Sequence, residues 1–190
     1  WSSDVCSSDL RCMKKRQVDH VLRAAGRIRG QKKFIIFGSQ ALHARHPDIP
    51  DTIIKSAEVD LFVPNQPDRT EWLVAIGVYS PFYEEFGYYA DPVSEDTATL
   101  PKSWKGRLVK LPPGDTEGVL GFCLDPHDLA IAKYAAFREK GLIFTRELAR
   151  RGILSKEQLL TLLGQTKLTD ELRERILARI AADFALVAAD

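Results

Sequence analysis

An alternation of acidic and apolar residues at Glu58-Val59-Asp60-Leu61 sets narrow limits on how this chain can fold. Side chains of a β-strand point alternately to its two faces, so Glu58 and Asp60 are predicted to share one face, about 7 Å apart. Like charges at that spacing repel, and a bound divalent cation with oxygen ligands relieves the repulsion. The same pattern is also typical of the solvated face of an edge strand.

A glycine turn precedes this acidic segment. The apolar run of residues 34–37 ends at Gly38-Ser39, and a short helix-like segment follows. Backbone N–H groups at a turn between a strand and a helix start are a common phosphate site, although Gly-Ser is also an ordinary turn. The order of the two features predicts that Gly38 and Ser39 bind the phosphates of a nucleoside triphosphate next to a metal site.

The succession of these motifs resembles the polymerase-β-like nucleotidyltransferase superfamily. More narrowly, the stretch from about Lys33 to Leu154 resembles an uncharacterised bacterial nucleotidyltransferase-like family, which is related to the nucleotidyltransferases of abortive-infection (type IV) toxin–antitoxin systems. The segments that carry the resemblance are GSQAL, SAEVDLFV, SPFYEEFGYYAD, LPKSWKGRLV and CLDPHDLAIAKYAAFREK. It implies an α/β (α+β) fold, with a mixed sheet flanked by helices and a helical C-terminal part, and a metal-dependent chemistry.

The resemblance also implies roles for the acidic residues. Glu58 and Asp60 would act in catalysis by holding Mg²⁺ or Mn²⁺, which would bridge the triphosphate and lower the pKa of the attacking hydroxyl. Sites of this superfamily usually have a third carboxylate on a neighbouring strand. Asp91 is the first candidate for this metal ligand, and Asp96 is the second.

Residues 125–140 are predicted to form one helix with Asp125 as its N-cap. Lys133 lies in the centre of the apolar stripe, where an unpaired ammonium is costly, so its side chain either reaches the edge of the stripe or contacts an anion. In the resembling family such a helix supplies a Lys, an Arg and then an Asp around the nucleotide. Lys133 matches the first of these residues and is predicted to be catalytic, and Arg138 matches the second. Gly141 stands in place of the acid.

The organisation of the chain is predicted after its first ten residues are set aside. WSSDVCSSDL resembles a translated sequencing adapter, so residues 1–10 are expected not to be native, and without Asp4 and Asp9 the formal net charge rises from +1 to +3. Residues 11–140 are predicted to form the nucleotidyltransferase-like core. Residues 141–190 are predicted to form a helical appendage packed on that core.

Cysteine content and hydropathy predict the compartment. Beyond residue 10 the sequence contains Cys12 and Cys123, with no C-x-x-C and no histidine cluster at zinc spacing, which favours a reducing environment over a zinc site. No run approaches the ~18 apolar residues that span a membrane. These features together predict a cytoplasmic protein without a membrane partner.

Two further regions each have two interpretations. Residues 11–33 contain nine lysines and arginines against one acid, Asp19, which would suit either the steering of an RNA or nucleotide or an ordinary solvated helix face. Residues 79–89 contain four of the five tyrosines, together with Phe82 and Phe86. Such a segment would suit either stacking on a base or filling a core.

The sequence therefore supports a leading hypothesis and an alternative. We expect transfer of a nucleoside monophosphate from a nucleoside triphosphate to a hydroxyl group. The acceptor would be an RNA end, such as that of tRNA, or a protein. One possible setting is a toxin–antitoxin system. The alternative is a catalytically degenerate module that binds a nucleotide, an RNA, or a partner antitoxin or target protein. The long gap between Ser39 and Glu58 and the glycine at position 141 favour the alternative.

Overall fold

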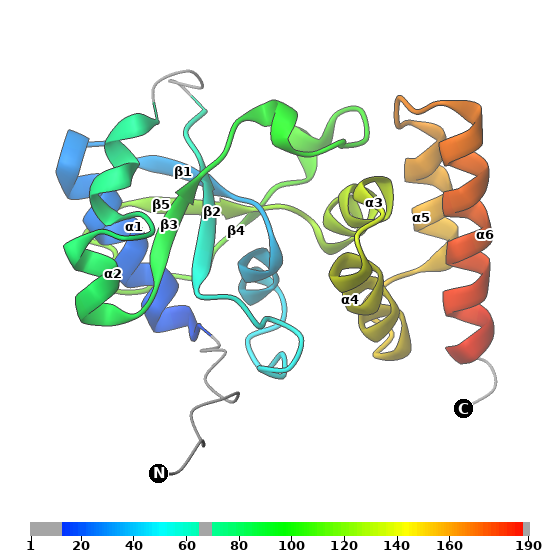
Figure 1. The fold of residues 1–190 in the computed structure, drawn as a ribbon, viewed down its shortest axis with the longest axis horizontal. Coiled ribbons are helices and arrows are strands. Elements are labelled where there is room, and N and C mark those ends of the chain that lie inside the picture. Colours follow the sequence, from blue (N-terminus) through cyan, green and yellow to red (C-terminus); the bar gives the residue numbers. More distant parts are fainter. Residues whose placement is uncertain (1–12, 65–69, 188–190) are drawn as a thin grey trace, which may run out of the picture. The chain divides into compact units, whose positions relative to one another are not determined.

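The structure is a computed structural model that describes residues 13–64 and 70–187 (Figure 1). The expectation for residues 1–10 lies outside these described residues. The chain divides into two compact units. The first unit takes its described residues from Trp1–Val93 and Lys110–Phe122, and the second takes them from Ser94–Val109 and Cys123–Asp190.

The α/β part of the chain is built on a mixed sheet of five strands. These are β1 (Lys33–Ile36), β2 (Glu58–Phe62), β3 (Tyr89–Pro92), β4 (Val109–Lys110) and β5 (Leu120–Cys123). Their order is β3-β2-β1-β5-β4, with β1 antiparallel to β2 and β2 parallel to β3. The predicted mixed sheet is therefore confirmed. Because β2 has a neighbour on each side, it is not the edge strand that its acidic face could have indicated.

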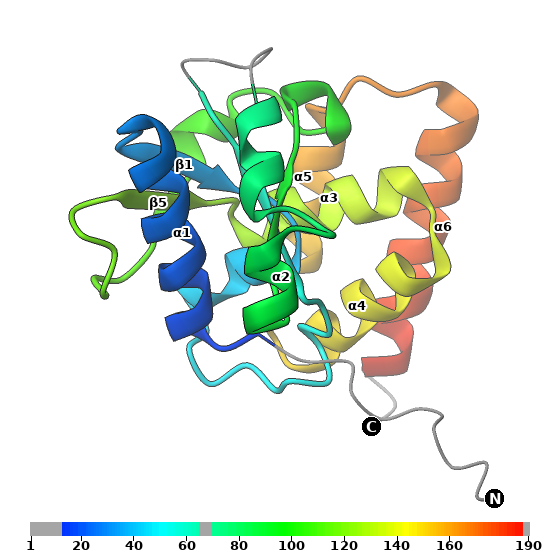
Figure 2. The same ribbon diagram turned by 60° about the vertical axis from the view of Figure 1, so that its left-hand side comes forward.

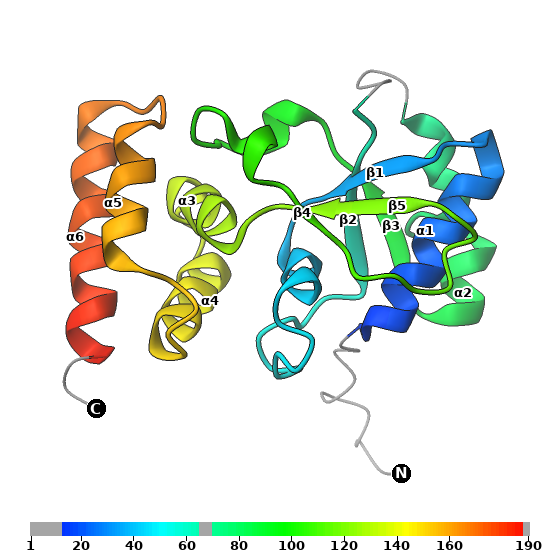
Figure 3. The same ribbon diagram turned by 180° about the vertical axis from the view of Figure 1, so that it is seen from behind.

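Helices of the first unit cover one face of the sheet. They are α1 (Lys15–Arg29), α2 (Pro81–Phe86) and the 3₁₀ helix η2 (Glu71–Ile76). Figure 2 shows α1 and α2 in front of the strands, and Figure 3, seen from behind, shows β1 and β5 in front of α1. The apolar side of α1, with Val18, Val21, Leu22 and Ala25, is buried in the core. Its Leu22 packs so closely over Gly121 of β5 that a Cβ on the glycine would lie 3.0 Å from Leu22 Cδ1.

The second unit is helical, as expected for the C-terminal part. Its elements are the 3₁₀ helices η3 (Glu95–Thr97) and η4 (Trp104–Arg107), followed by α3 (Pro126–Ala136), α4 (Glu139–Arg150), α5 (Lys156–Gly164) and α6 (Asp170–Val187). α3 packs against α4, α5 and α6, and α6 also packs against α4 and α5. No helix in the described part of the chain combines the length and the apolar character that a membrane span requires.

The predicted single helix over residues 125–140 is wrong, because the chain breaks it at Phe137. Asp125 does cap α3, and its side chain accepts a hydrogen bond from the backbone N–H of His127 at 2.9 Å. Phe137 then adopts a left-handed conformation with φ 51°, and the Arg175 guanidinium of α6 stacks over its ring at 4.2 Å. α4 begins afresh at Glu139, so position 141 lies in a new helix rather than in the helix that carries Lys133.

Candidate active site

Strands β2 and β3 present acidic side chains on one face of the sheet. Leu61 is fully buried and pairs with Ile36 on the side of α1, whereas Glu58 and Asp60 alternate with it and are partly exposed. Asp91 of β3 lies directly opposite Asp60 in the parallel register, so the two side chains point to the same side. Together these three acids form what we call the carboxylate face, which points away from α1.

The predicted glycine turn lies against one of these carboxylates. Gly38 adopts φ 63° and ψ −168°, which only glycine adopts readily. A Cβ built on Gly38 would lie 1.8 Å from Asp60 Oδ2, so the turn leaves room for this carboxylate only because it has no side chain. The backbone N–H of Phe37 donates to the Asp60 carbonyl oxygen at 2.9 Å, which fixes the turn beside β2. Ser39 is the first residue of the 3₁₀ helix η1 (Ser39–Ala44).

A neutral donor orients Glu58. The Tyr89 hydroxyl donates a hydrogen bond to Glu58 Oε2 at 2.9 Å, and the two residues lie opposite each other in the β2–β3 register. Burial raises the pKa of Tyr89 first, and the hydrogen bond to Glu58 and the negative charges of Glu58 and Asp91 raise it further. The hydroxyl therefore keeps its proton at neutral pH. The Tyr83 ring packs edge-on against that of Tyr89, with centroids 5.1 Å apart, and limits its movement.

Asp91 lies in surroundings that disfavour its ionised form. Burial raises the pKa of its carboxyl group, and the negative charge of Glu58 raises it further. A cation held by both side chains would act in the opposite direction, because it would favour both carboxylates in their charged form. The carboxylate face thus carries a charge repulsion that the fold has not relieved at Asp91.

The donor set of the carboxylate face suits a hard divalent cation, since Mg²⁺ and Mn²⁺ prefer carboxylate oxygens. Among the residues that the structure describes, no three His, Cys, Asp or Glu side chains are gathered closely enough to hold a metal ion. A metal site here therefore requires the side chains of this face to converge on the ion. Tyr89 contacts one oxygen of Glu58, so the other oxygen can serve as a ligand.

The remaining predicted site residues belong to the second unit. Lys133 in α3 is partly buried, and its Nζ lies 5.9 Å from the ring centroid of Phe144 in α4. Arg138 is exposed between α3 and α4, and Asp96 is exposed in η3. The structure thus brings the glycine turn and the acidic residues together within the first unit. Of the two candidates for a third carboxylate, Asp91 is the one on the carboxylate face.

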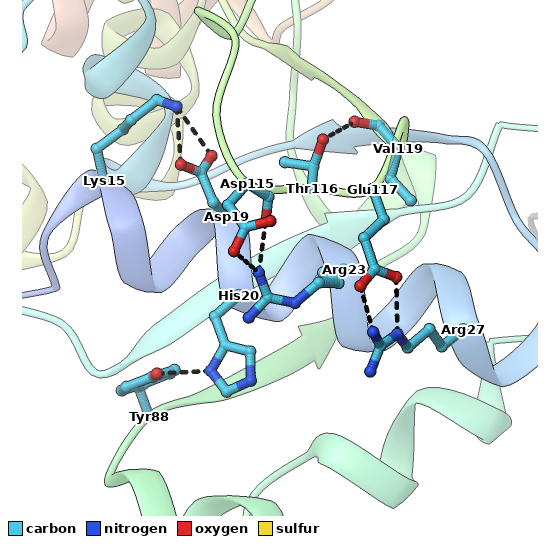
Figure 4. Close-up of polar contacts among 10 residues, drawn as sticks. All are labelled: Lys15, Asp19, His20, Arg23, Arg27, Tyr88, Asp115, Thr116, Glu117 and Val119. Atoms are coloured by element: carbon cyan, nitrogen blue, oxygen red, sulfur yellow. Dashed lines mark hydrogen bonds and ion pairs between the residues drawn. The ribbon is translucent and has the colours of Figure 1, made fainter.

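The basic face of α1 is paired in large part. Figure 4 shows three ion pairs along this helix: Lys15 with Asp19, Arg23 with Asp115, and Arg27 with Glu117. The acids at positions 115 and 117 come from the turn between β4 and β5. Acids from a distant part of the sequence therefore offset part of the positive charge in residues 11–33, which weakens the argument for a helix that steers RNA.

Phe82, Phe86 and Tyr88 of the aromatic segment pack inside the first unit, whereas Tyr79 is 86% exposed. Phe82, Phe86 and Tyr88 surround the ring of His20 from α1, with ring centroids between 4.6 and 5.9 Å away. The Tyr88 hydroxyl lies 2.8 Å from His20 Nδ1 (Figure 4). Burial lowers the pKa of His20, with the Arg23 charge as a second cause, so the ring is neutral among these side chains. Core packing is therefore the better interpretation of this cluster.

Tyr89 is the residue of this site that the sequence interpretation missed. Its signal was present, because Tyr89 and Asp91 alternate at the same spacing as Glu58 and Asp60. The register between β2 and β3 decides that the tyrosine faces Glu58, and that register depends on the folded sheet rather than on any local sequence pattern.

A comparison with protein families gives a match over nearly the whole described chain. Residues 15–185 match the family described as "Nucleotidyltransferase of unknown function (DUF6036)". Comparisons with curated proteins and with solved structures gave no match. The matched range contains residues of both units, including the glycine turn, the carboxylate face and Lys133.

Proposed function

The chain belongs to this family of nucleotidyltransferases, and we propose that it transfers a nucleoside monophosphate from a nucleoside triphosphate to a hydroxyl group. The hydroxyl oxygen forms a bond to the α-phosphorus, the bond from that phosphorus to the bridging oxygen breaks, and pyrophosphate leaves. The observation that carries the proposal is the carboxylate face beside the Gly38 turn. The acceptor is proposed to be an RNA end or a protein side chain, and a toxin–antitoxin system is one setting for such a reaction.

The acids of the first unit are proposed to hold the metal. Glu58, Asp60 and Asp91 supply carboxylate oxygens, and Tyr89 keeps Glu58 oriented through its hydrogen bond. Bound Mg²⁺ or Mn²⁺ supplies charge neutralisation at the triphosphate and lowers the pKa of the attacking hydroxyl. The proton of that hydroxyl would be released to solvent water once the bound metal has lowered the pKa of the hydroxyl.

Four residues are proposed to contact the phosphates. Gly38 and Ser39 offer backbone N–H groups and a hydroxyl beside Asp60, where the β- and γ-phosphates would lie. Lys133 and Arg138 are proposed to offset the negative charge that redistributes over the phosphates during transfer. Gly141 lies against Lys133, since a Cβ there would be 3.5 Å from Lys133 Cδ, so a side chain at this position would start beside the lysine.

A second candidate function is nucleotide binding without transfer. Two observations favour it: Glu58 is already engaged by Tyr89, and the described side chains are not gathered into a metal site. In this version the Gly38 turn and the carboxylate face bind a nucleotide. A partner protein or RNA would then recognise the nucleotide-bound form of the chain rather than a covalent product.

The decisive experiment compares the parent chain with Asp60→Asn and with Asp96→Asn. Each protein is incubated with Mg²⁺, total RNA and each α-labelled nucleoside triphosphate in turn, and label is followed into RNA and protein bands. Asp60→Asn should lower the transfer rate about a thousandfold, since a metal ligand contributes several kcal/mol to the transition state. Asp96→Asn removes an exposed carboxylate of the second unit and should leave the rate unchanged.

Three outcomes separate the candidates. Label that disappears with Asp60→Asn alone supports transfer and identifies both the acceptor and the base. No label with any nucleotide, together with Mg²⁺-dependent nucleotide binding that Asp60→Asn abolishes in calorimetry, supports the binding module. Label that survives Asp60→Asn, or the absence of both transfer and binding, would overturn both candidates.

A further inference from the structure

Gln40 is a buried polar residue that connects the two parts of the candidate site. It is the second residue of η1, two positions after Gly38, and it is completely buried. Its Nε2 donates a hydrogen bond to the carbonyl oxygen of Ser56 at 3.2 Å and lies 3.5 Å from that of Ile54. Both acceptors belong to the segment that leads into β2. Gln40 therefore joins the glycine turn to the start of the acidic strand.

The orientation of the Gln40 amide follows from its partners. A carbonyl oxygen can only accept a hydrogen bond, so the amide nitrogen must face the backbone of residues 54–56. The amide oxygen, Oε1, is then buried with no hydrogen-bond partner in the described part of the chain. A buried acceptor without a donor destabilises a fold, and an apolar side chain of the same length would fill the space without that cost. The need for a donor to Ser56, rather than packing, accounts for a glutamine at this position.

Ser56 in turn holds the backbone of Glu58. Its carbonyl oxygen accepts from Gln40, and its hydroxyl oxygen accepts from the Glu58 N–H at 3.1 Å. The next residue, Ala57, accepts a hydrogen bond from the backbone N–H of Tyr89 at 2.9 Å, where the pairing of β2 with β3 begins. A shift of Ser56 would therefore move Glu58 at the point where the strand enters the sheet.

The chain between the glycine turn and β2 needs such an anchor. After η1, residues 45–57 form turns without a helix or strand. The backbone hydrogen bonds donated by Ile49 and Ile53 are local, since each spans three residues. Segments of this kind open more readily than the sheet that they enter. A donor that reaches from η1 to Ser56 fixes the end of the segment, so the long gap before Glu58 is compatible with an ordered site.

We propose that Gln40 is a positioning residue: through Ser56 it fixes Glu58 in relation to the Gly38 turn, and thus the proposed metal ligand in relation to the proposed phosphate site. This inference rests on the proposed nucleotidyl transfer, because it gives Gln40 a role in that reaction. Gln40 is buried and acts through Ser56. Loss of its amide should therefore act mainly on the rate of the bound complex, since a misplacement of about 1 Å can lower a rate about a hundredfold.

Transfer kinetics of Gln40→Met test this role. Methionine has nearly the length of glutamine but neither the amide donor nor the unpaired acceptor, so the midpoint of urea unfolding should change little. We expect kcat to fall about tenfold and the dissociation constant for Mg²⁺ to rise about threefold, with KM for the nucleoside triphosphate within about twofold of the parent value. Thr116→Val is the control, because it removes a hydroxyl donor to the Val119 carbonyl oxygen in the turn between β4 and β5, and it should leave these values unchanged.

A double-mutant cycle with Ser56→Ala separates positioning from a merely structural role. Ser56→Ala removes the hydroxyl that holds the Glu58 N–H, so it should lower kcat about as much as Gln40→Met does. Because both changes release the same residue, the double variant should be at most about threefold slower than either single variant. Losses that multiply in full, to about a hundredfold below the parent, would overturn the proposal.

Hydrogen exchange of the Glu58 backbone amide gives a readout that does not need transfer. This N–H donates to the Ser56 hydroxyl, so Gln40→Met should speed its exchange about tenfold and leave the amides of α1 unchanged. If the parent transfers no nucleotide, the proposed function fails, and Mg²⁺ binding and Glu58 exchange alone decide whether Gln40 positions Glu58. If the parent transfers but Gln40→Met keeps the kcat or the Glu58 exchange of the parent, the proposed function stands and the role of Gln40 fails.

Discussion

The buried acids of the second unit and the acids of the carboxylate face have opposite surroundings. In the second unit, Asp128 is completely buried and accepts hydrogen bonds from the Arg107 guanidinium at 2.7 and 2.9 Å, and Asp183 is held by Tyr134 and Arg146. On the carboxylate face, burial raises the pKa of Asp91, and the negative charge of Glu58 raises it further. The buried acids Asp128 and Asp183 are paired with arginines, and these pairs stabilise the fold. The unrelieved repulsion at Asp91 is what we expect of a site that binds a cation.

The largest effect on stability is expected when a fold-serving acid loses its cation. Arg107→Gln leaves Asp128 buried without its guanidinium partner and should lower the free energy of unfolding by about 3 kcal/mol. Lys105→Gln, in the same 3₁₀ helix, breaks an exposed ion pair with Glu95 and should cost under about 0.5 kcal/mol. Urea denaturation of both variants measures the two values, and equal losses would mean that the buried pairing of Asp128 stabilises the fold no more than an exposed ion pair does.

A smaller effect is expected at the glycine turn. Gly38→Ala combines an unfavourable backbone conformation with a collision against the Asp60 carboxylate, so it should cost about 2 kcal/mol and weaken Mg²⁺ binding. Gly30→Ala is the matched control, because Gly30 has a similar φ of 66° but nothing within 4 Å of an added Cβ. It should cost about 1 kcal/mol and leave Mg²⁺ binding intact. Identical behaviour of the two variants would mean that the close approach of Asp60 has no consequence.

Tyr89→Phe tests whether the carboxylate face is held ready for a cation. Without the hydroxyl, Glu58 loses a donor that contributes about 1 kcal/mol, and the dissociation constant for Mg²⁺ measured by calorimetry should rise about fivefold. Tyr83→Phe changes the ring that packs on Tyr89 without removing a hydrogen bond to Glu58, and it should have no effect. Tighter Mg²⁺ binding by Tyr89→Phe would show instead that the tyrosine competes with the metal, as the binding-only candidate requires.

The smallest effect is expected from Asp91, and it depends on pH. Because its pKa is raised in the folded protein, its ionised form disfavours the fold. Its contribution to stability is therefore complete below the ordinary pKa of 3.8 and is lost as the pH rises through the folded-state value. Asp91→Asn should consequently raise the free energy of unfolding at pH 7, by under about 0.5 kcal/mol because solvent screens the charge.

Unfolding curves at several pH values, with and without Mg²⁺, measure this effect. The advantage of Asp91→Asn over the parent should vanish near pH 3 and should reverse when saturating Mg²⁺ is added, since only the parent keeps all three carboxylates. Asp96→Asn, which changes an exposed acid, should track the parent throughout. An advantage that persists at low pH would contradict the assignment of the repulsion to Asp91.

The sequence predicts what depends on local periodicity. The alternation in β2 placed Glu58 and Asp60 on one face, and the structure agrees because an internal strand must bury its apolar side. The N-cap of α3 was also predictable, since it needs only Asp125 and the proline that follows it. The pairing of Asp91 with Asp60 depends on strand register, which no local pattern encodes.

Long-range contacts explain the remaining differences. The helix break at Phe137 contains neither glycine nor proline, and the partner that covers its ring, Arg175 from α6, lies 38 residues further along the sequence. The basic face of α1 looked unpaired because its partners at positions 115 and 117 are about 90 residues away in the sequence. The roles of Lys133 and Arg138 rest on family resemblance and stay predictions.

The strand order affects how the chain folds while the ribosome synthesises it. β1, with the apolar run of residues 34–37, takes one neighbour from β2 and the other from β5, which is made about 60 residues after β2. At a synthesis rate of about 5–20 residues per second, one edge of this apolar strand therefore stays open for roughly 3–12 seconds. During that interval the nascent chain offers a template for mispairing, and it should depend on chaperones more strongly than its size alone would suggest.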